Sequence, residues 1–144
     1  MIKEFANKWD KYKNDLEDYF RNTEQKEYCN YKKIVEILFE KIINRDYEYD
    51  SDKYDTKNIL NIDDGYYQGT EIFILHKDCY QPSIDEYVYS HTYYGSCSGC
   101  DTLLAICDFL DSDGKPNEEQ INDYMRLSLH LLQKCKYMRE KYEI

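Results

Sequence analysis

The sequence predicts an α+β fold, with a helical hairpin and two further helices packed around a small antiparallel sheet of two or three strands. Both ends of the chain carry apolar residues at helical spacing, and its middle holds two β-branched, aromatic runs of strand length. Glycine, proline and aspartate separate these segments, as in turns. A chain of 144 residues is expected to form one domain, 1–144, because this length suffices for a hydrophobic core.

The N-terminal part, residues 1–44, is predicted to be the helical hairpin. In its first helix the apolar residues alternate steps of three and four, which places them on one stripe. These residues are Ile2, Phe5, Trp9, Tyr12, Leu16 and Tyr19. The second helix is predicted from Glu27 to Asn44. Its apolar face consists of Tyr31, Ile34, Val35, Leu38 and Ile42.

Residues 45–58 alternate acidic residues with tyrosines and contain almost no aliphatic side chain. We expect an exposed connection here. Its aspartates do not form an EF-hand, because the sixth position counted from Asp50 is Asp55, where the calcium loop requires glycine. The segment is therefore interpreted as acidic surface.

Residues 59–144 are predicted to contain the sheet and the last two helices. Thr70 to His76 and Glu86 to Tyr94 are the two clear strands, and Ile59 to Ile62 is a candidate edge strand before the turn at Asp64 and Gly65. Antiparallel pairing is expected because the connections are short.

A third helix is predicted from Gly99, with Ser98 and Asp101 as its capping pair. Its apolar face would consist of Leu103, Leu104, Cys107 and Leu110, and the turn DSDG at residues 111–114 together with Pro116 would end it. The last helix is predicted to begin at the capping sequence Asn117-Glu-Glu-Gln120. Its inward residues would be Ile121, Tyr124, Met125, Leu131, Leu132, Cys135 and Met138.

Charge is concentrated in the middle of the chain. The net charge is −10, and residues 46–119, with four Lys/Arg and seventeen Asp/Glu, contribute −13. Such a surface repels phosphates, which argues against direct nucleic-acid binding, and it attracts basic protein surfaces. A protein partner with a basic surface is therefore expected, although acidic charge also serves solubility alone. A homodimer is a further alternative.

The junction between the second strand and the third helix is the candidate binding site. Small residues there can expose backbone N–H groups to an anion, and tyrosines offer flat surfaces with a polar tip. The candidate residues are Tyr93, Tyr94, Gly95, Ser96, Cys97, Ser98, Gly99, Cys100 and Asp101. The alternative role of the same residues is structural, with the glycines permitting a tight turn and the tyrosines packing the sheet.

Two other chemistries remain open at this junction. His76, Cys79, Cys97 and Cys100 have spacings that fit a structural zinc site, although the apolar strand around His76 argues against their convergence. Alternatively, Cys97 and Cys100 at a helix start would support a small thiol-dependent enzyme. We expect neither a cofactor nor catalysis. The N-terminal residues lack an apolar signal-peptide core, and no apolar run approaches the roughly 20 residues of a membrane span. A cytoplasmic protein with all six cysteines as thiols or ligands is therefore expected, although their even number would also fit disulfides in a secreted protein.

The segment HTYYGSCSGCDTLLAI, preceded by DCYQPSIDEY and followed by NDYMRLSLHLLQ, resembles a group of small bacteriophage and prophage proteins that share the core YYGSCSGCDTL. The resemblance covers residues 72–135. It implies an accessory protein made in the host cytoplasm and brings no functional residues with it. Together with the charge, it leads to the hypothesis of a binding protein that modulates or inhibits a host factor.

Overall fold

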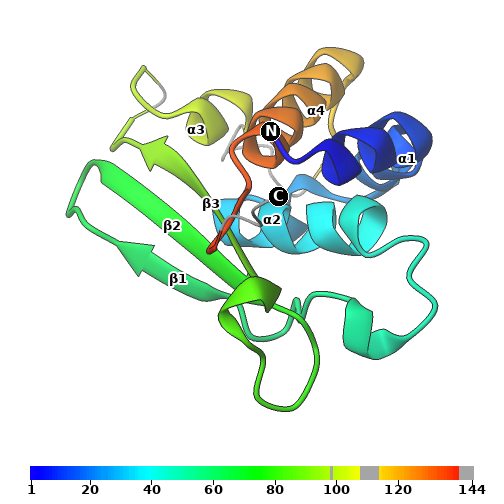
Figure 1. Ribbon diagram of the computed structural model, residues 1–144. Helices are drawn as coiled ribbons and strands as arrows, with labels where there is room; N and C mark the ends of the chain where they lie inside the picture. Colours follow the sequence, from blue (N-terminus) through cyan, green and yellow to red (C-terminus); the bar gives the residue numbers. More distant parts are fainter. Residues whose placement is uncertain (98, 108–113, 140–144) are drawn as a thin grey trace.

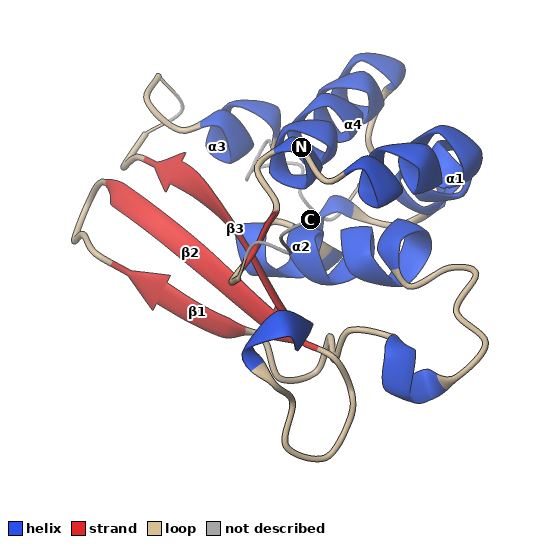
Figure 2. Cartoon of the chain, in the orientation of Figure 1, coloured by secondary structure: helices blue, strands red, loops and turns tan. Residues whose placement is uncertain are grey.

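A computed structural model of the chain describes residues 1–97, 99–107 and 114–139. In these ranges it has four α-helices on one side of a four-stranded antiparallel sheet (Figures 1 and 2). The helices are α1 (Lys3–Asn22), α2 (Tyr31–Leu38), α3 (Thr102–Ile106) and α4 (Glu118–Gln133), and the strands are β1 (Leu60–Asp63), β2 (Gly69–His76), β3 (Tyr87–Tyr94) and β4 (Lys136–Tyr137). The predicted α+β class is confirmed, and the predicted number of strands is too low.

The sheet follows the order of the chain, β1-β2-β3-β4. Its centre is the β2–β3 pair, which runs in register from Gly69 opposite Tyr94 to His76 opposite Tyr87. The unpredicted strand, β4, adds only two residue pairs at the β3 edge. It follows α4 almost directly, so the sequence there was interpreted as helix. As a result Met138, predicted to point inward, is instead 37% exposed.

Alternate residues of β2 and β3 point to opposite faces of the sheet. Phe73, Leu75 and Val88 are fully buried against the helical layer. Their neighbours Ile72 and Ile74 are only half-buried, because they point to the other face. The hydrophobic core therefore lies between one face of the sheet and the helices.

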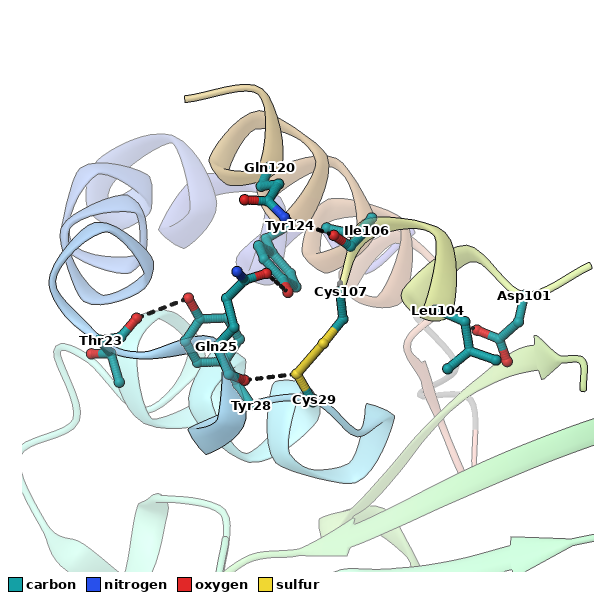
Figure 3. Close-up of a disulfide and its surroundings, with 10 residues drawn as sticks. All are labelled: Thr23, Gln25, Tyr28, Cys29, Asp101, Leu104, Ile106, Cys107, Gln120 and Tyr124. Carbon is teal, nitrogen blue, oxygen red and sulfur yellow. Dashed lines mark hydrogen bonds between the residues drawn. A yellow bond between two sulfur atoms is a disulfide. The ribbon is translucent and has the colours of Figure 1, made fainter. Parts of the chain in front are cut away.

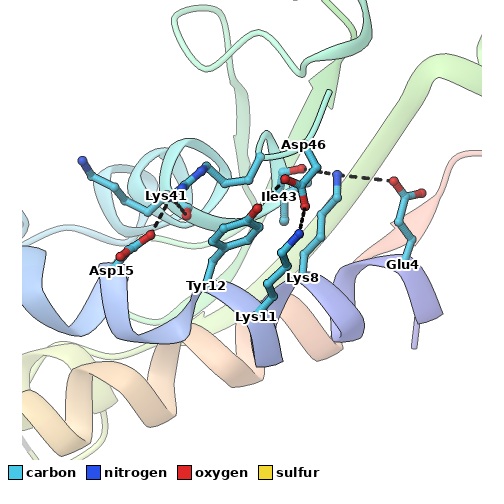
Figure 4. A network of polar contacts seen from close by, with 9 residues as sticks. Glu4, Lys8, Lys11, Tyr12, Asp15, Lys41, Ile43 and Asp46 are labelled. Atoms are coloured by element: carbon cyan, nitrogen blue, oxygen red, sulfur yellow. Dashed lines mark hydrogen bonds and ion pairs between the residues drawn. The ribbon is translucent and has the colours of Figure 1, made fainter. Parts of the chain in front are cut away.

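Helix α1 packs through the predicted stripe, of which Phe5, Trp9 and Leu16 are buried. The stripe also includes Lys8, whose side chain was not expected inside. Its amine donates a hydrogen bond to the Ile43 carbonyl at 2.8 Å, so the buried cation has a partner (Figure 4).

Polar side chains continue this contact between α1 and the turn after α2. Asp46 accepts hydrogen bonds from Lys11 at 3.0 Å and from the Tyr12 hydroxyl. One turn further along α1, Asp15 accepts from Arg45 at 2.7 Å. Figure 4 shows Lys11 and Tyr12 of α1 meeting Asp46 across the two segments. They hold the start of the acidic connection against the first helix.

Helix α2 begins later than predicted. Residues 25–27 form a separate 3-10 turn, and Asn30 then caps α2 by accepting from the Lys33 N–H at 2.7 Å. The predicted face is correct, since all five of its residues are buried. The helix continues through residues 39–43 with wider π-type bonding, as the Asn44 N–H reaches the Phe39 carbonyl at 2.8 Å.

The expected exposed connection, residues 45–58, is anchored by a buried tyrosine. Tyr54 is only 4% exposed. Its ring lies edge-on to Phe5 and Phe39, with centroid distances of 6.2 and 5.4 Å. Asn44 binds both the N–H and the carbonyl of Tyr54. The other residues of the segment are exposed or half-buried, so the prediction was wrong only at Tyr54, because an aromatic ring between acidic residues still gains by burial.

Helix α3 begins at Thr102, capped by Asp101, which accepts from the Leu104 N–H at 3.1 Å. The expected cap Ser98, the expected core residue Leu110 and most of the DSDG turn lie outside the described residues. The predicted capping box of α4 is confirmed, with Asn117 and Gln120 binding each other's backbone N–H. Of its predicted inward residues, Ile121, Tyr124, Leu131, Leu132 and Cys135 are buried and Met125 packs at the edge of the core. None of the described helices is long and apolar enough to cross a membrane.

Candidate functional site

The β3–α3 loop, residues 95–101, is fastened at both ends by the carboxylate of Asp101. This side chain is 6% exposed. One oxygen accepts from the Gly95 N–H at 2.8 Å, at the start of the loop. The other accepts from the Leu104 N–H in α3 and from the Tyr31 hydroxyl at 2.7 Å. A single buried acid thus fixes the span between strand and helix.

Tyr31 connects this loop to α2. Its hydroxyl donates to Asp101 and accepts from the Leu103 N–H at 3.0 Å. Burial, together with the hydrogen bond to Asp101, raises the pKa of Tyr31 above its ordinary value, so the phenol remains a donor. Asp101 was predicted as part of the site, whereas the role of Tyr31 was missed. Its place on an apolar helix face made it look like a packing residue.

Cys97 and Cys100 meet within this loop. Both are exposed, and their sulfur atoms lie 3.0 Å apart. The Cys100 N–H donates to the Cys97 carbonyl at 3.0 Å, and the Cys97 N–H donates to the Cys100 sulfur at 3.3 Å. The hydrogen bond from the Cys97 thiol, followed by that from the Cys97 N–H, lowers the pKa of Cys100. The protonated Cys100 thiol donates to the Cys97 carbonyl at 3.3 Å, whereas the Cys97 donors favour its thiolate, and the net direction is a lowered pKa.

Gly95 is required by the position of this sulfur. A Cβ atom at residue 95 would lie 2.5 Å from the Cys100 sulfur and 2.6 Å from the Cys100 carbonyl oxygen. Gly99 differs, because a Cβ there would meet only the Cys97 sulfur at 3.8 Å. The absence of a side chain at Gly95 lets the loop fold back closely on itself.

Three of the backbone N–H groups that were predicted to bind an anion already have acceptors within the loop. The Gly95 N–H is taken by Asp101, and the Cys97 and Cys100 N–H groups are used inside the turn. The two tyrosines before the loop also separate. Tyr93 is 70% exposed on the outer face, whereas the Tyr94 hydroxyl donates to Asp63 of β1 on the helical side. Ser96 and Gly99 are exposed.

The four residues of the zinc alternative do not converge. His76 pairs with Tyr87 at one end of the β2–β3 ladder, and the loop with Cys97 and Cys100 follows the other end. An eight-residue strand separates these ends by roughly 23 Å at about 3.3 Å per residue. Cys79 instead donates to a Glu86 carboxylate oxygen at 3.2 Å. Within the described ranges no group of three or more His, Cys, Asp or Glu side chains is placed to hold a metal ion.

Two cysteines that were expected to be free thiols or ligands form a disulfide. Cys29, just before α2, is bonded to Cys107, which follows α3 (Figure 3). The expectation failed because residues 78 positions apart meet only after the helices pack. A disulfide is uncommon in a reducing cytosol, so the cytoplasmic compartment stays a prediction.

A surface cavity of about 460 Å³ lies beside the loop. Its wall includes Tyr31, Asp101, Gly95 and Cys29, together with Glu71 of β2. Burial raises the pKa of Glu71, whose carboxylate accepts a hydrogen bond from the Asn61 amide at 3.1 Å. Two side-chain pairs of this lining, Tyr31 with Asp101 and Asn61 with Glu71, thus already bind each other.

The outer face of the sheet is a second candidate surface, which the sequence interpretation missed. In the register of the sheet, Leu60, Ile74 and Tyr89 lie side by side, and Ile62, Ile72 and His91 form the next row. Leu60 is 55% and Ile62 is 44% exposed. The uninterrupted apolar run at residues 72–75 was the available signal, because it indicates a strand that is apolar on both faces.

No protein family, curated protein or solved structure matches this chain.

Proposed function

We propose that this protein acts by binding another protein, and that the contact surface is the outer face of the sheet. The observation that carries the proposal is the group of neighbouring aliphatic and aromatic side chains there, which no described helix or strand covers. Its members are Leu60, Ile62, Ile72, Ile74, Tyr87, Tyr89, His91 and Tyr93. Contiguous apolar patches of this kind on a protein surface mark interaction sites more often than isolated apolar residues do.

The make-up of this face suits a protein partner. Aliphatic side chains of the edge strand β1 and of β2 form one side of it, and aromatic side chains of β3 form the other. Tyrosine and other aromatic residues are enriched in protein interfaces, where the ring is buried and the polar tip finds a partner. Tyr93, which is 70% exposed, is the last residue of this face before the β3–α3 loop.

Charge indicates the kind of partner. Residues 46–119, which include β1, β2 and β3, carry a net −13 from four Lys/Arg and seventeen Asp/Glu. A partner with an apolar patch surrounded by basic side chains would match this distribution, and charge complementarity speeds association and selects the partner. The resemblance to phage proteins supports a host-cell protein as that partner. Modulation or inhibition of a host factor is the function we propose.

The edge strand offers a direct test. Leu60 and Ile62 are exposed, so the double variant Leu60→Lys/Ile62→Lys places two cations on the face without opening the core. Lysine is tolerated on edge strands. The matched control is Ile84→Lys, because Ile84 is 42% exposed in the connection between β2 and β3.

Proteins captured from host-cell lysate on the wild-type chain are identified by quantitative mass spectrometry. Their affinities are then measured with purified components. The double variant is expected to bind the partner at least about tenfold more weakly, a loss of ~1.4 kcal/mol of binding free energy. Ile84→Lys is expected to bind it with the wild-type affinity. Equal binding by all three proteins, or a self-associating chain whose dimer is lost in the double variant, would contradict the proposal.

A further inference from the structure

We propose that Cys97 and Cys100 are a redox-active dithiol that reacts with low-molecular-weight disulfides and closes to an intramolecular disulfide. This activity is separate from the proposed protein binding. It rests on an observed pair of sulfur atoms 3.0 Å apart, both exposed. A disulfide bond is about 2.05 Å long, so the loop needs an approach of only about 1 Å to close.

The surroundings of the pair do not give it another role. An exposed thiol contributes little to a core, and buried cysteines are the ones that act as small apolar residues. A metal would need further ligands, and none of the described His, Cys, Asp or Glu side chains forms a cluster with the pair. The adjacent carboxylate of Asp101 is occupied by Gly95, Leu104 and Tyr31.

Geometry assigns different roles to the two sulfurs. Cys100 accepts a hydrogen bond from the Cys97 N–H at 3.3 Å and is the sulfur placed against Gly95. Hydrogen bonds to a sulfur stabilise its anion, and the lowered pKa of Cys100 agrees with this. Cys100 is therefore the attacking thiolate. Cys97, in contact with it, is the resolving thiol.

The reaction proceeds in two exchange steps. The Cys100 thiolate attacks one sulfur of the small disulfide, forming a mixed disulfide and releasing the other half as a thiolate that takes up a proton. Cys97, on losing its proton, attacks the Cys100 sulfur, which forms the Cys97–Cys100 bond and expels the second half as a thiol. The protein loses two hydrogens with two electrons, and the small disulfide gains them as two thiols.

The loop is prepared for this reaction by residues that do not react. Gly95 leaves room for the Cys100 sulfur, and Asp101 holds the Gly95 N–H at 2.8 Å. These are positioning residues. The two remaining thiols are placed differently, since Cys79 donates to Glu86 and Cys135 is 1% exposed. Exchange is therefore expected at one pair only.

The experiment uses the full chain, treated with a mild reductant that leaves the Cys29–Cys107 bond intact, and glutathione disulfide as the probe. After quenching, free thiols are alkylated, and peptide mass mapping assigns each cysteine. Wild-type protein is expected to lose two hydrogens and two alkylation sites, at Cys97 and Cys100. The variant Cys97→Ser should stop with one glutathione on Cys100, and Cys100→Ser should react at least about tenfold more slowly.

Several results would overturn the proposal. One is that Cys97 and Cys100 are both still alkylated after treatment with glutathione disulfide. Another is that the wild-type protein stops at the mixed disulfide with glutathione. A third is that Cys79 reacts as fast as Cys100. Both cysteines are exposed, so the serine variants are expected to fold, and circular dichroism checks this. Because the pair lies outside the Leu60 and Ile62 surface, a double serine variant that still captures the partner separates failure of this proposal from failure of the binding proposal.

Discussion

One pair of cysteines precedes α3, and a second pair links the end of α3 to the start of α2. The two pairs differ in exposure, in sequence separation and in whether they are bonded. Cys97 and Cys100 lie three residues apart in an exposed turn before the helix. Cys29 and Cys107 are 78 positions apart, and their bond joins the end of α3 to the start of α2. Closing a long loop constrains the unfolded chain strongly, whereas closing a four-residue turn constrains it little. The distant pair therefore stabilises the fold, and the neighbouring pair is available for chemistry.

The two pairs are connected through the start of α3. The hydrogen bond between Asp101 and Tyr31 ties the loop with the exposed thiols to α2. The disulfide ties the end of α3 to the residue Cys29, just before the same helix. Helix α3 spans only five residues and would not be stable alone. It is held at its first turn by hydrogen bonds and at its last by a covalent bond.

The largest difference between the pairs is expected in stability. The double variant Cys29→Ser/Cys107→Ser should lower the free energy of unfolding by about 2–5 kcal/mol, because the unfolded chain regains the freedom that the cross-link removes. Cys97→Ser/Cys100→Ser is the matched control and should change it by less than about 0.5 kcal/mol. Urea unfolding followed by circular dichroism measures both. Similar losses in the two double variants would show that the pairs do not differ in this way.

A smaller effect is expected from the link between the pairs. Tyr31→Phe removes the hydroxyl that serves both Asp101 and the Leu103 N–H. Asp101 keeps the Gly95 and Leu104 N–H groups as donors, so the main cost is the buried Leu103 N–H left without its acceptor, about 1–3 kcal/mol. Tyr93→Phe removes a hydroxyl from a ring that is 70% exposed and should be nearly neutral.

The Tyr31→Phe variant should also speed hydrogen exchange at the Gly95 N–H, since its acceptor Asp101 loses one of the two donors that hold its other oxygen. Exchange followed by mass spectrometry and urea unfolding test the two statements together. A variant that is destabilised no more than Tyr93→Phe would show that water replaces the hydroxyl without cost.

The smallest effect concerns the rate at which the remaining thiols react. The lowered pKa of Cys100 means a larger thiolate fraction at neutral pH, whereas the hydrogen bond to Glu86 raises the pKa of Cys79. Burial raises the pKa of Cys135 to about 12. Iodoacetamide labelling between about pH 6 and 9 should therefore modify Cys100 first, with a midpoint below the ordinary thiol value, and Cys135 only after unfolding. Faster labelling of Cys79 than of Cys100 at any pH in this range would contradict the expectation.

Features that depend on neighbouring residues were predictable. The apolar stripe of α1, the face of α2 and the capping box at Asn117 each follow from a pattern within one segment. The strands at residues 69–76 and 87–94 follow likewise from their composition. Part of the candidate loop was also visible, because glycines and a CxxC spacing between a strand and a helix indicate a tight turn.

Features that depend on distant residues were not predictable. Strand β4 is too short for a periodic signal, and it forms because the end of α4 comes to lie beside β3. Tyr54 was predicted to be exposed, but its ring packs against Phe5 and Phe39, which are distant from it in the sequence. The uncovered face of the sheet also required the structure, since an apolar strand does not show on which side the helices lie.

The sequence by itself determined the elements, the acidic charge of the middle segment and the closeness of Cys97 to Cys100, because these depend on residues that are neighbours along the chain. Tertiary structure alone decided that Cys29 meets Cys107 and that Tyr31 supports the candidate loop. The physical reason is that each of these contacts forms only after loops of many residues close, and such closure is favoured by the burial of the whole core rather than by any local pattern.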